Sequence, residues 1–282
     1  MDQGLFCILS GFAFALGASI ASFLNVVIWR CPRGESLVSP PSHCPKCNAP
    51  IRWYQNIPLV SWLALRGRCA VCREPISPRY FFVELLGGVL FLAVFREFAG
   101  SLSAAEIVQL AVLLVWTSLM IVGTFIDFDH QLLPDFVTVG GMIIGLLFAV
   151  FCGYEHFGFA SWTSFTWRPL AVSAIGLAVG FGLLGLIRAV GSMVFRREAM
   201  GMGDVFLLGA VGALFGPVAA LFTIVFSAFI GAVAGIGLMI FQRIRPGRFV
   251  AIPYGPYICM ACLLWMFRGQ EIVDWYLSMF RT

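Results

Sequence analysis

The sequence predicts an all-α polytopic membrane protein with about eight transmembrane helices and a small cytoplasmic loop domain stapled by zinc. Of its 282 residues, 60% are hydrophobic and only 11% are charged, whereas soluble domains average about 25% charged residues. The mean hydropathy is +0.94. A soluble core could not bury this much apolar surface, so the bilayer must solvate most of the chain.

Eight apolar segments are expected to cross the membrane, because one span needs about 20 apolar residues. They are residues 5–28, 81–95, 107–126, 136–152, 170–190, two short spans within 205–241, and 250–266. The run 205–241 carries no charge and is too long for one helix, and Gly216-Pro217 near its middle is a natural break. The first span is expected to be retained, since no basic stretch precedes it and the apolar run continues past its small residues.

Basic residues give a separate indication of topology. They are concentrated in the segment between the first two spans and in the segments after the fifth and seventh spans. These residues are Arg30, Arg33, Lys46, Arg52, Arg66, Arg68, Arg73, Arg79, Arg188, Arg196, Arg197, Arg243, Arg245 and Arg248. With eight spans, all three segments fall on one side, which the positive-inside rule assigns to the cytoplasm. Both termini are then outside, and the small net charge of +4 reflects topology and contact with membrane lipid, with no nucleic-acid partner.

The chain is therefore expected to have three parts. Residues 1–29 form the first transmembrane helix, residues 30–80 form a cytoplasmic four-cysteine loop domain, and residues 81–282 form a seven-helix membrane domain. The loop domain has about 50 residues, too few to build much of a core without a metal or disulfides. No internal repeat is apparent beyond the pattern of spans.

Two CxxC pairs lie in the loop domain, Cys44-Pro45-Lys46-Cys47 and Cys69-Ala70-Val71-Cys72. A CxxC turn directs two thiolates at one ion, and two such turns complete the tetrahedral all-sulfur site that suits zinc. The cytoplasm is reducing, so we favour a structural zinc site over two disulfides or two redox-active pairs. His43 is an alternative ligand, and Cys259 and Cys262 in the last span are interpreted as packing residues.

Two acidic clusters interrupt the apolar pattern. One contains Asp127, Asp129 and Asp135 at the cytoplasmic end of the third span, and the other is Gly201-Met202-Gly203-Asp204 at the start of the sixth. Ionisable groups at this depth are candidates for function. If Asp127 and Asp204 lie within about 5 Å they would share one proton, so one carboxylate could act as base toward water and the other as acid toward a carbonyl. The glycines would let a substrate strand approach closely.

The aspartates also have structural interpretations. Asp135 and Asp204 could each cap the helix that follows. Asp129 lies about 200° around a helix from Asp127, so one of the two is expected to face solvent. No serine or metalloprotease motif is present, and His130 is interpreted as interfacial.

Two other functions are compatible with intramembrane carboxylates. A proton- or ion-coupled transporter with a zinc-binding loop would use them as relays, but the two matching halves with broken helices that such folds show are not apparent. A zinc-knuckle scaffold with inert aspartates is the second alternative.

A series of motifs in a fixed order covers nearly the whole chain. They are Ala21-Ser-Phe-Leu-Asn25-Val-Val-Ile28, the paired CxxC loop, Asn56-Ile-Pro-Leu-Val-Ser-Trp62, Pro75-Ile-Ser-Pro-Arg79-Tyr-Phe-Phe-Val-Glu84-Leu-Leu, the Asp127 cluster, Gly201-Met-Gly-Asp204 and Ile252-Pro-Tyr-Gly-Pro-Tyr257. In these motifs the sequence resembles the bacterial type IV prepilin peptidases, a family of bifunctional leader peptidases and N-methyltransferases.

The resemblance implies an aspartyl protease of the bacterial inner membrane with Asp127 and Asp204 as the catalytic pair. Its substrates would be prepilins, type II secretion pseudopilins or both, cut after a glycine on the cytoplasmic side. S-adenosylmethionine would then methylate the new N-terminal residue, an activity associated with the region 30–79, although no residue that binds this cofactor is identified. Gln55 and Phe206 depart from the family pattern, which often has an acidic residue and a lysine at these positions.

Overall fold

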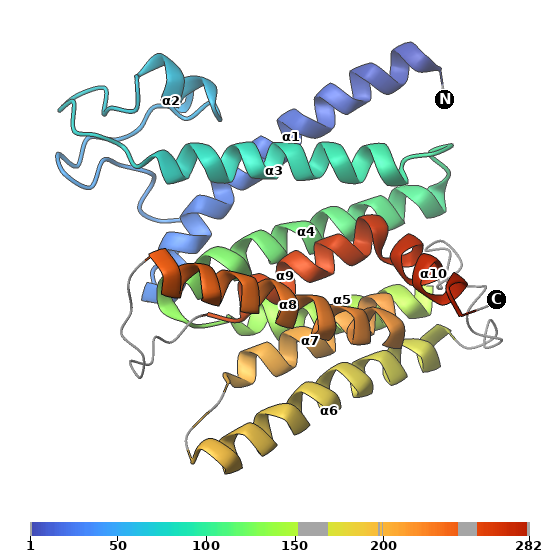
Figure 1. Ribbon diagram of the computed structural model, residues 1–282. Coiled ribbons are helices and arrows are strands. Elements are labelled where there is room, and N and C mark those ends of the chain that lie inside the picture. The colour runs from blue at the N-terminus through green and yellow to red at the C-terminus, as the bar shows by residue number, and fades with distance from the viewer. Residues whose placement is uncertain (1, 152–168, 197, 199, 242–252, 281–282) are drawn as a thin grey trace. The chain divides into compact units, whose positions relative to one another are not determined.

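The computed structural model describes residues 2–151, 169–196, 198, 200–241 and 253–280, and within them the chain is helical with no β-strand (Figure 1). The α-helices are α1 (Gln3–Arg30), α2 (Val60–Ala64), α3 (Pro78–Phe98), α4 (Ala104–His130), α5 (Asp135–Phe151), α6 (Pro169–Phe195), α7 (Met202–Phe215), α8 (Pro217–Phe241), α9 (Gly255–Leu264) and α10 (Gln270–Ser278). The short helical turns are η1 (Cys31–Arg33), η2 (Trp53–Gln55) and η5 (Trp265–Gly269), a π turn between α9 and α10. The predicted all-α fold is confirmed.

The helices follow the apolar segments of the sequence. Four of those described are long and apolar enough to cross a membrane by length and composition, namely Gln3–Arg33, Ala104–His130, Pro169–Phe195 and Pro217–Ile240. Two shorter apolar helices, Asp135–Val150 and Met202–Phe215, fall within other expected spans. Residues 152 and 250–252 of the expected spans lie outside the described residues. These helices indicate a multi-pass membrane protein, while the count of eight spans stays a prediction.

The expected break within the run 205–241 is present. α7 ends at Phe215 and α8 begins at Pro217, with Gly216 between them at a φ of +87°. Glycine adopts this backbone conformation readily, whereas residues with a side chain rarely do. Proline is well suited to the first turn of α8, because its missing N–H would have no intrahelical partner there.

The chain forms two compact units, Met1–Val122 and Gly123–Thr282. In the first unit, α1 packs against α3. A Cβ on Gly17 of α1 would lie 2.5 Å from the carbonyl oxygen of Gly87 in α3, so the two backbones are in contact at this point. Small residues permit such close approach between helices in membranes.

One polar contact joins α1 to α3, and a second attaches the loop between them to α3. The Asn25 side chain in α1 donates to the carbonyl oxygen of Tyr80 at 3.2 Å. The carboxylate of Glu84 in α3 accepts the N–H of Leu59, the residue before α2, at 2.8 Å. Leu59 has a φ of +62°, an unfavourable conformation for leucine. The buried Glu84 carboxylate therefore stabilises a strained turn of the loop.

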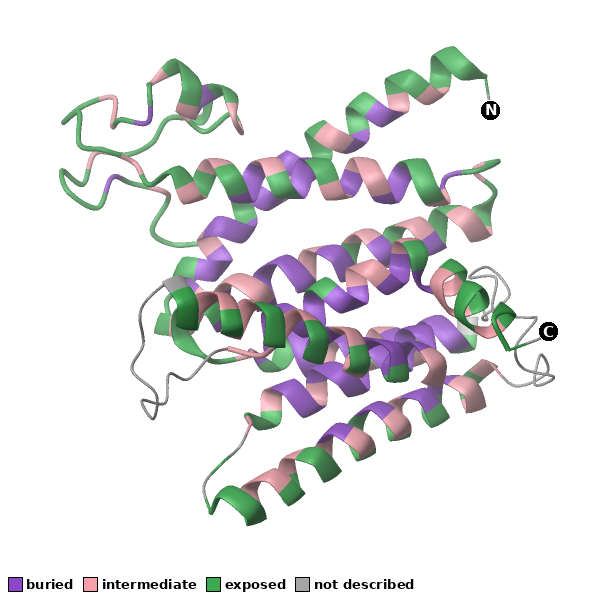
Figure 2. Cartoon of the chain, viewed as in Figure 1, coloured by how far each residue is buried: buried purple, intermediate pink, exposed green. Residues whose placement is uncertain are grey.

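α7 lies at the centre of the second unit, where it contacts α5, α6, α8 and α9. Nearly all of its residues are buried, and Figure 2 shows this helix as the most continuously buried part of that unit. A helix that is hydrophobic all round is expected to be buried. A Cβ on Gly176 of α6 or on Gly212 of α7 would lie 2.0 Å from the carbonyl oxygen of the other residue. α7, which contains the sixth expected span, therefore forms the core of this unit although it has only 14 residues.

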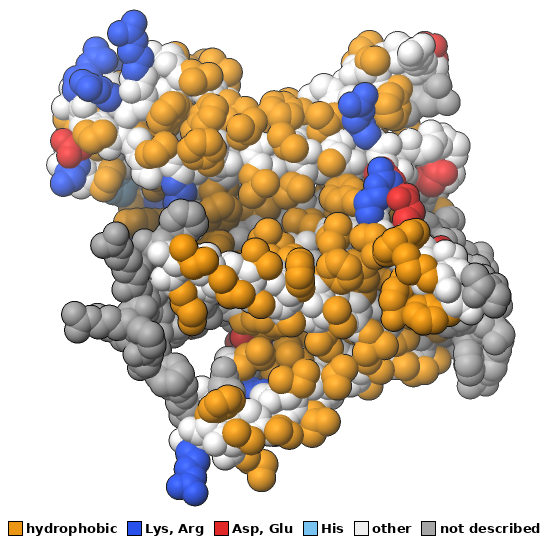
Figure 3. Space-filling model, in the orientation of Figure 1, with side chains coloured by type: hydrophobic (Ala, Val, Ile, Leu, Met, Phe, Trp, Pro, Cys, Tyr) orange, Lys and Arg blue, Asp and Glu red, His pale blue; other side chains and the backbone are white. Residues whose placement is uncertain are grey.

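The exposed surface is largely apolar, as expected for helices that contact lipid. Figure 3 shows hydrophobic side chains over most of the visible helical surface, with a group of Lys and Arg side chains over the loop between α1 and α3. Exposed large side chains include Phe12, Val225 and Phe229. Four of the arginines used for the topology, Arg197, Arg243, Arg245 and Arg248, lie outside the described residues.

Candidate functional site

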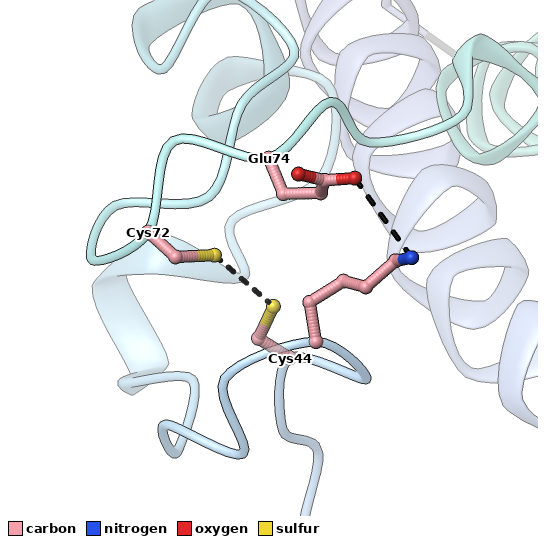
Figure 4. Close-up of polar contacts among 4 residues, drawn as sticks. Cys44, Cys72 and Glu74 are labelled. Carbon is pink, nitrogen blue, oxygen red and sulfur yellow. Dashed lines mark hydrogen bonds and ion pairs between the residues drawn. The ribbon is translucent and has the colours of Figure 1, made fainter.

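The four cysteines of the two CxxC pairs come together in the loop between α1 and α3. Their sulfur atoms all lie within 4.8 Å of one another. The Cys44 and Cys72 sulfurs are 3.8 Å apart and point toward one another in Figure 4, and the Cys47 and Cys69 sulfurs are 4.0 Å apart. A tetrahedral zinc site with Zn–S bonds of about 2.3 Å requires sulfurs about 3.8 Å apart. The cluster therefore has the donor atoms and the spacing to hold a metal ion.

The two CxxC turns have the same backbone pattern. In each, the first cysteine donates its N–H to the carbonyl five residues later and accepts the N–H of the residue four positions later. That fourth residue, Asn48 or Arg73, has a positive φ of 56° or 60°. Each turn is closed by an isolated bridge, His43 with Pro50 and Arg68 with Pro75. The two turns are thus an internal repeat, and the expectation that the chain has no repeat beyond its spans is wrong.

The thiols of this cluster differ in acidity. The backbone N–H groups of Cys72 and Val71 stabilise the Cys69 thiolate and lower the pKa of Cys69 to about 6. Although the N–H of Glu74 acts in the opposite direction, desolvation and the neighbouring thiols raise the pKa of Cys72 to about 12. Four adjacent thiolates repel one another, so a bound cation is needed to ionise the whole set near neutral pH.

The side chains next to the cysteine cluster contribute no further metal ligand and little stability. His43 contacts the Pro41 carbonyl oxygen at 3.0 Å and is not among the side chains grouped as possible metal ligands. The ammonium of Lys46 and the carboxylate of Glu74 are 4.0 Å apart and link the two turns (Figure 4). Because both side chains are well exposed, this ion pair contributes at most about 1 kcal/mol.

Asp127 lies in the last turn of α4 and is only 5% exposed. Its Oδ2 accepts the N–H of Gly255, the first residue of α9, at 3.0 Å. A Cβ on Gly255 would lie 2.7 Å from that oxygen. Glycine is therefore required at this position for the start of α9 to approach the carboxylate.

Asp204 lies in the first turn of α7 and is only 7% exposed. The N-cap residue of the helix is Gly201, and no side-chain hydrogen bond caps it. Asp204 is therefore not the N-cap residue, and the interpretation that it caps this helix is wrong. A carboxylate is favourable at a helix N-terminus because it interacts with the helix dipole.

The two carboxylates come close enough for their charges to interact. The side chain of Leu133 lies beside both Gly203 and Gly255, since a Cβ on either glycine would lie 2.9 Å or 3.3 Å from it, respectively. Residues from α4, α7 and the start of α9 thus converge on one place within the second unit. The expected separation of about 5 Å between the carboxylates stays a prediction.

The start of α9 contacts Asp127. Its first residue, Gly255, donates to Asp127, and the preceding residue, Tyr254, lies within range of the Asp204 charge. The hydroxyl of Tyr254 is 2.7 Å from that of Ser227 in α8. Reasoning from the sequence did not assign roles to Tyr254, Gly255 or Ser227, although the first two lie in one of the motifs that carried the resemblance.

The other acidic residues of the first cluster face outward. Asp129 is exposed while Asp127 is buried, as the rotation of about 200° between them requires. Asp135 is exposed and is the first residue of α5, where its charge is favourable to the helix. Gly203 packs against Leu133. Supporting roles of Asp129, Asp135, Gly201 and Gly203 in catalysis stay predictions.

The two departures from the family pattern have local structural roles. The side-chain oxygen of Gln55 accepts the N–H of Arg52 at 3.1 Å and caps η2, a contact that an acidic side chain would also make. Phe206 packs edge-on against Phe181, with ring centroids 5.4 Å apart. Neither residue forms the contacts described for Asp127 or Asp204.

Two family models match the chain. The bacterial peptidase A24 N-terminal domain matches residues 15–98, and the type IV leader peptidase family matches residues 114–236. The first match contains the cysteine cluster and the second contains both buried aspartates. No solved structure matches.

Several relatives carry the name prepilin leader peptidase/N-methyltransferase. That of Myxococcus xanthus is 43% identical over 236 residues, which cover 84% of this chain and 64% of that protein. That of Aeromonas hydrophila is 35% identical over 99% of this chain and 98% of its own length. The Neisseria gonorrhoeae relative is 35% identical over 94% of each chain. Nothing in these matches supports the alternative of a transporter. With its two buried aspartates and its four-cysteine loop, the chain belongs to the type IV leader peptidase family.

Proposed function

We propose that this protein cleaves the leader peptide of type IV prepilins, type II secretion pseudopilins or both, and then methylates the new N-terminal residue. Cleavage would follow a glycine on the cytoplasmic side of the bacterial inner membrane. The observation that carries the proposal is the convergence of two buried carboxylates, Asp127 and Asp204, at the start of α9. The family match and the names of the relatives support the same activity.

In this proposal the aspartates act as a pair that shares one proton. The ionised carboxylate takes a proton from water, whose oxygen bonds to the scissile carbonyl carbon. The protonated carboxylic acid gives its proton to the carbonyl oxygen, and a second transfer to the amide nitrogen accompanies cleavage of the C–N bond. The Gly255 N–H holds Asp127 in one orientation, which keeps the pair aligned.

The loop between α1 and α3 is assigned to the second activity. We propose that zinc binds Cys44, Cys47, Cys69 and Cys72, because the chemistry and spacing of the sulfurs suit it. Four cysteine ligands leave no open position, so this zinc would be structural. S-adenosylmethionine would supply the methyl group for the new N-terminal amine. The three-part division at residues 1–29, 30–80 and 81–282, with both termini outside and the aspartates facing the cytoplasm, completes the proposal.

The replacement of each aspartate by asparagine tests the protease mechanism. Asp127→Asn keeps an oxygen that can accept the Gly255 N–H, so its effect reports the loss of the carboxylate. We expect Asp127→Asn and Asp204→Asn to lower cleavage of a purified prepilin by about 10³-fold or more. Mass spectrometry of the products measures this loss. The matched comparison is Asp129→Asn, which changes an exposed carboxylate of the same cluster and, with a supporting role at most, should lower cleavage far less.

Both asparagine variants should still methylate a substrate whose leader has already been removed, which would show that the protein is folded. Cleavage at the wild-type rate by either variant would refute the aspartate pair. A loss of cleavage in Asp129→Asn equal to that in Asp127→Asn would also contradict the assignment of Asp127.

A further inference from the structure

A cavity of about 380 Å³ lies in the first unit between α1 and the loop that follows it. Small-molecule sites typically measure about 300–1,000 Å³. Its α1 wall includes Ser22, Phe23 and Arg30, and its loop wall includes Ser42 and Asn56. The three residues of α1 fall on one side of the helix, since their spacings of one and seven keep them within about 100° of one another. The cavity thus has an aromatic face, several polar groups and one cation.

Arg30 is the unusual member of this lining, because it is a buried cation that is paired with no carboxylate in the described part of the chain. The residue is 8% exposed. Its guanidinium donates to the carbonyl oxygens of Ser36 at 2.9 Å and Pro40 at 2.8 Å. These contacts hold the side chain in position but leave its charge uncompensated. Among the residues that the structure describes, no carboxylate pairs with Arg30, and none of the residues lining the cavity is acidic. Buried charges in proteins are normally paired, so this site is suited to an anionic group.

Other polar groups of the lining also lack partners within the described chain. The side chains of Ser22, Ser42 and Asn56 make no hydrogen bond to described protein groups. Ser42 lies two residues before the first CxxC turn, and Asn56 directly follows η2. A ligand with an anionic end and several hydrogen-bonding atoms would satisfy all of these groups at once.

We infer that this cavity binds the methyl donor, with the carboxylate of S-adenosylmethionine on Arg30. The inference rests on the proposed methyltransferase function and names the residues that would serve it. The Phe23 ring offers a flat apolar face for the adenine, and Ser22, Ser42 and Asn56 offer hydrogen bonds to its polar atoms. In the transfer, the N–CH₃ bond forms as the S–CH₃ bond breaks. The amine loses one proton to water, and the sulfonium becomes the neutral thioether of S-adenosylhomocysteine.

The absence of acidic residues from the lining fits this reaction. A carboxylate beside the sulfonium would stabilise its positive charge in the ground state, and that stabilisation is lost as the charge disappears in the transition state. Arg30 is proposed to bind the carboxylate at the other end of S-adenosylmethionine, and that carboxylate keeps its charge throughout the reaction. The cavity therefore binds through groups that the reaction leaves unchanged.

Direct binding of S-adenosylhomocysteine to the full-length, zinc-loaded protein in detergent tests the inference without any turnover. Arg30→Gln removes the cation, and Ser22→Phe fills the cavity. Arg30→Gln is expected to weaken binding about 10- to 100-fold by equilibrium dialysis, as for a lost charged hydrogen bond. Ser22→Phe is expected to weaken binding by at least about 10-fold, because the larger side chain occupies the cavity. The matched control is Arg33→Gln, whose guanidinium lies over the Trp29 ring outside the cavity lining and whose loss should leave binding unchanged. Zinc content and prepilin cleavage at wild-type levels show that each variant is folded.

The outcomes separate the two levels of the proposal. Wild-type affinity in both Arg30→Gln and Ser22→Phe, with methylation intact, would overturn the cavity assignment and leave the proposed function standing. A wild-type protein that neither binds S-adenosylhomocysteine nor methylates a cleaved substrate would overturn the methyltransferase function itself. If the two variants lost bound phosphatidylglycerol and kept their affinity for S-adenosylhomocysteine, the cavity would be a lipid site and the inference would be wrong.

Discussion

The cysteine cluster and the aspartate pair are assembled in different ways. The four cysteines come from two short turns of one loop, and each turn is closed by hydrogen bonds between residues at most five positions apart. Asp127 and Asp204 come from different helices, and the Gly255 turn that touches Asp127 comes from a third. The first site is mainly a local structure, whereas the second exists only when three helices pack correctly. The two sites should therefore respond differently to substitution.

The largest effect is expected from loss of one metal ligand. Cys72 is exposed, so Cys72→Ser removes a ligand with little change in packing. Structural zinc contributes about 10–16 kcal/mol to the folding of zinc-finger peptides. We expect bound zinc to fall far below one per chain and the loop to become sensitive to limited proteolysis, both measurable on purified protein.

A matched variant and a second activity sharpen this prediction. Cys7→Ser changes an exposed cysteine outside the cluster and should keep its zinc. Cleavage of prepilin by Cys72→Ser should change little, because both aspartates belong to the other unit. Full zinc occupancy in Cys72→Ser would contradict the four-cysteine site, and equal loss of zinc and cleavage would contradict the independence of the two sites.

The next effect concerns the packing that creates the aspartate pair. In Gly255→Ala the new Cβ would meet the Asp127 Oδ2 at 2.7 Å, so either α9 or the carboxylate must shift. A displacement of about 1 Å at a reacting group can lower the rate about 100-fold. We expect a loss of this size in prepilin cleavage, measured as kcat/KM, with zinc content unchanged.

The control for Gly255→Ala is Gly182→Ala in α6, because a Cβ at Gly182 would have no atom within 4 Å. This variant should cleave prepilin at the wild-type rate and be slightly more stable, since alanine favours helices. A similar loss of activity in both variants would show that glycine is needed for a reason other than the contact with Asp127.

The smallest effect is expected at the link between the loop and α3. Glu84→Ala removes the acceptor of the Leu59 N–H and leaves that group unpaired, which typically costs about 1–3 kcal/mol. Hydrogen exchange at the Leu59 amide should accelerate, while zinc stays bound. Glu84→Gln keeps an oxygen acceptor and should restore most of the protection. Equal exchange in all three proteins would remove the role assigned to Glu84.

Much of the aspartate pair and of the cysteine cluster could be predicted from the sequence, because these residue types are rare in an apolar chain. Asp127 and Asp204 stand out among hydrophobic spans, and the CxxC spacing identifies its four sulfurs without any structure. Gly255, Tyr254 and Ser227 could not be found in this way. A glycine, a tyrosine and a serine in an apolar helical region are ordinary residues until a contact such as Gly255 with Asp127 shows what they do. The repeat between the two CxxC turns was visible in principle, since each reads Cys-x-x-Cys-x-x-Pro-Ile.

The sequence by itself determined that the chain is helical and lies in a membrane, which thiols are candidate metal ligands and which carboxylates are candidates for catalysis. These features depend on composition and on spacing over a few residues, where the geometry follows from local backbone structure. Only the tertiary structure decided that Asp127 meets Gly255, that Asp204 lies near Asp127, and that Arg30 borders a cavity whose lining has no acidic residue. Such contacts depend on how closely helices pack, and that is set by side chains far apart in the sequence.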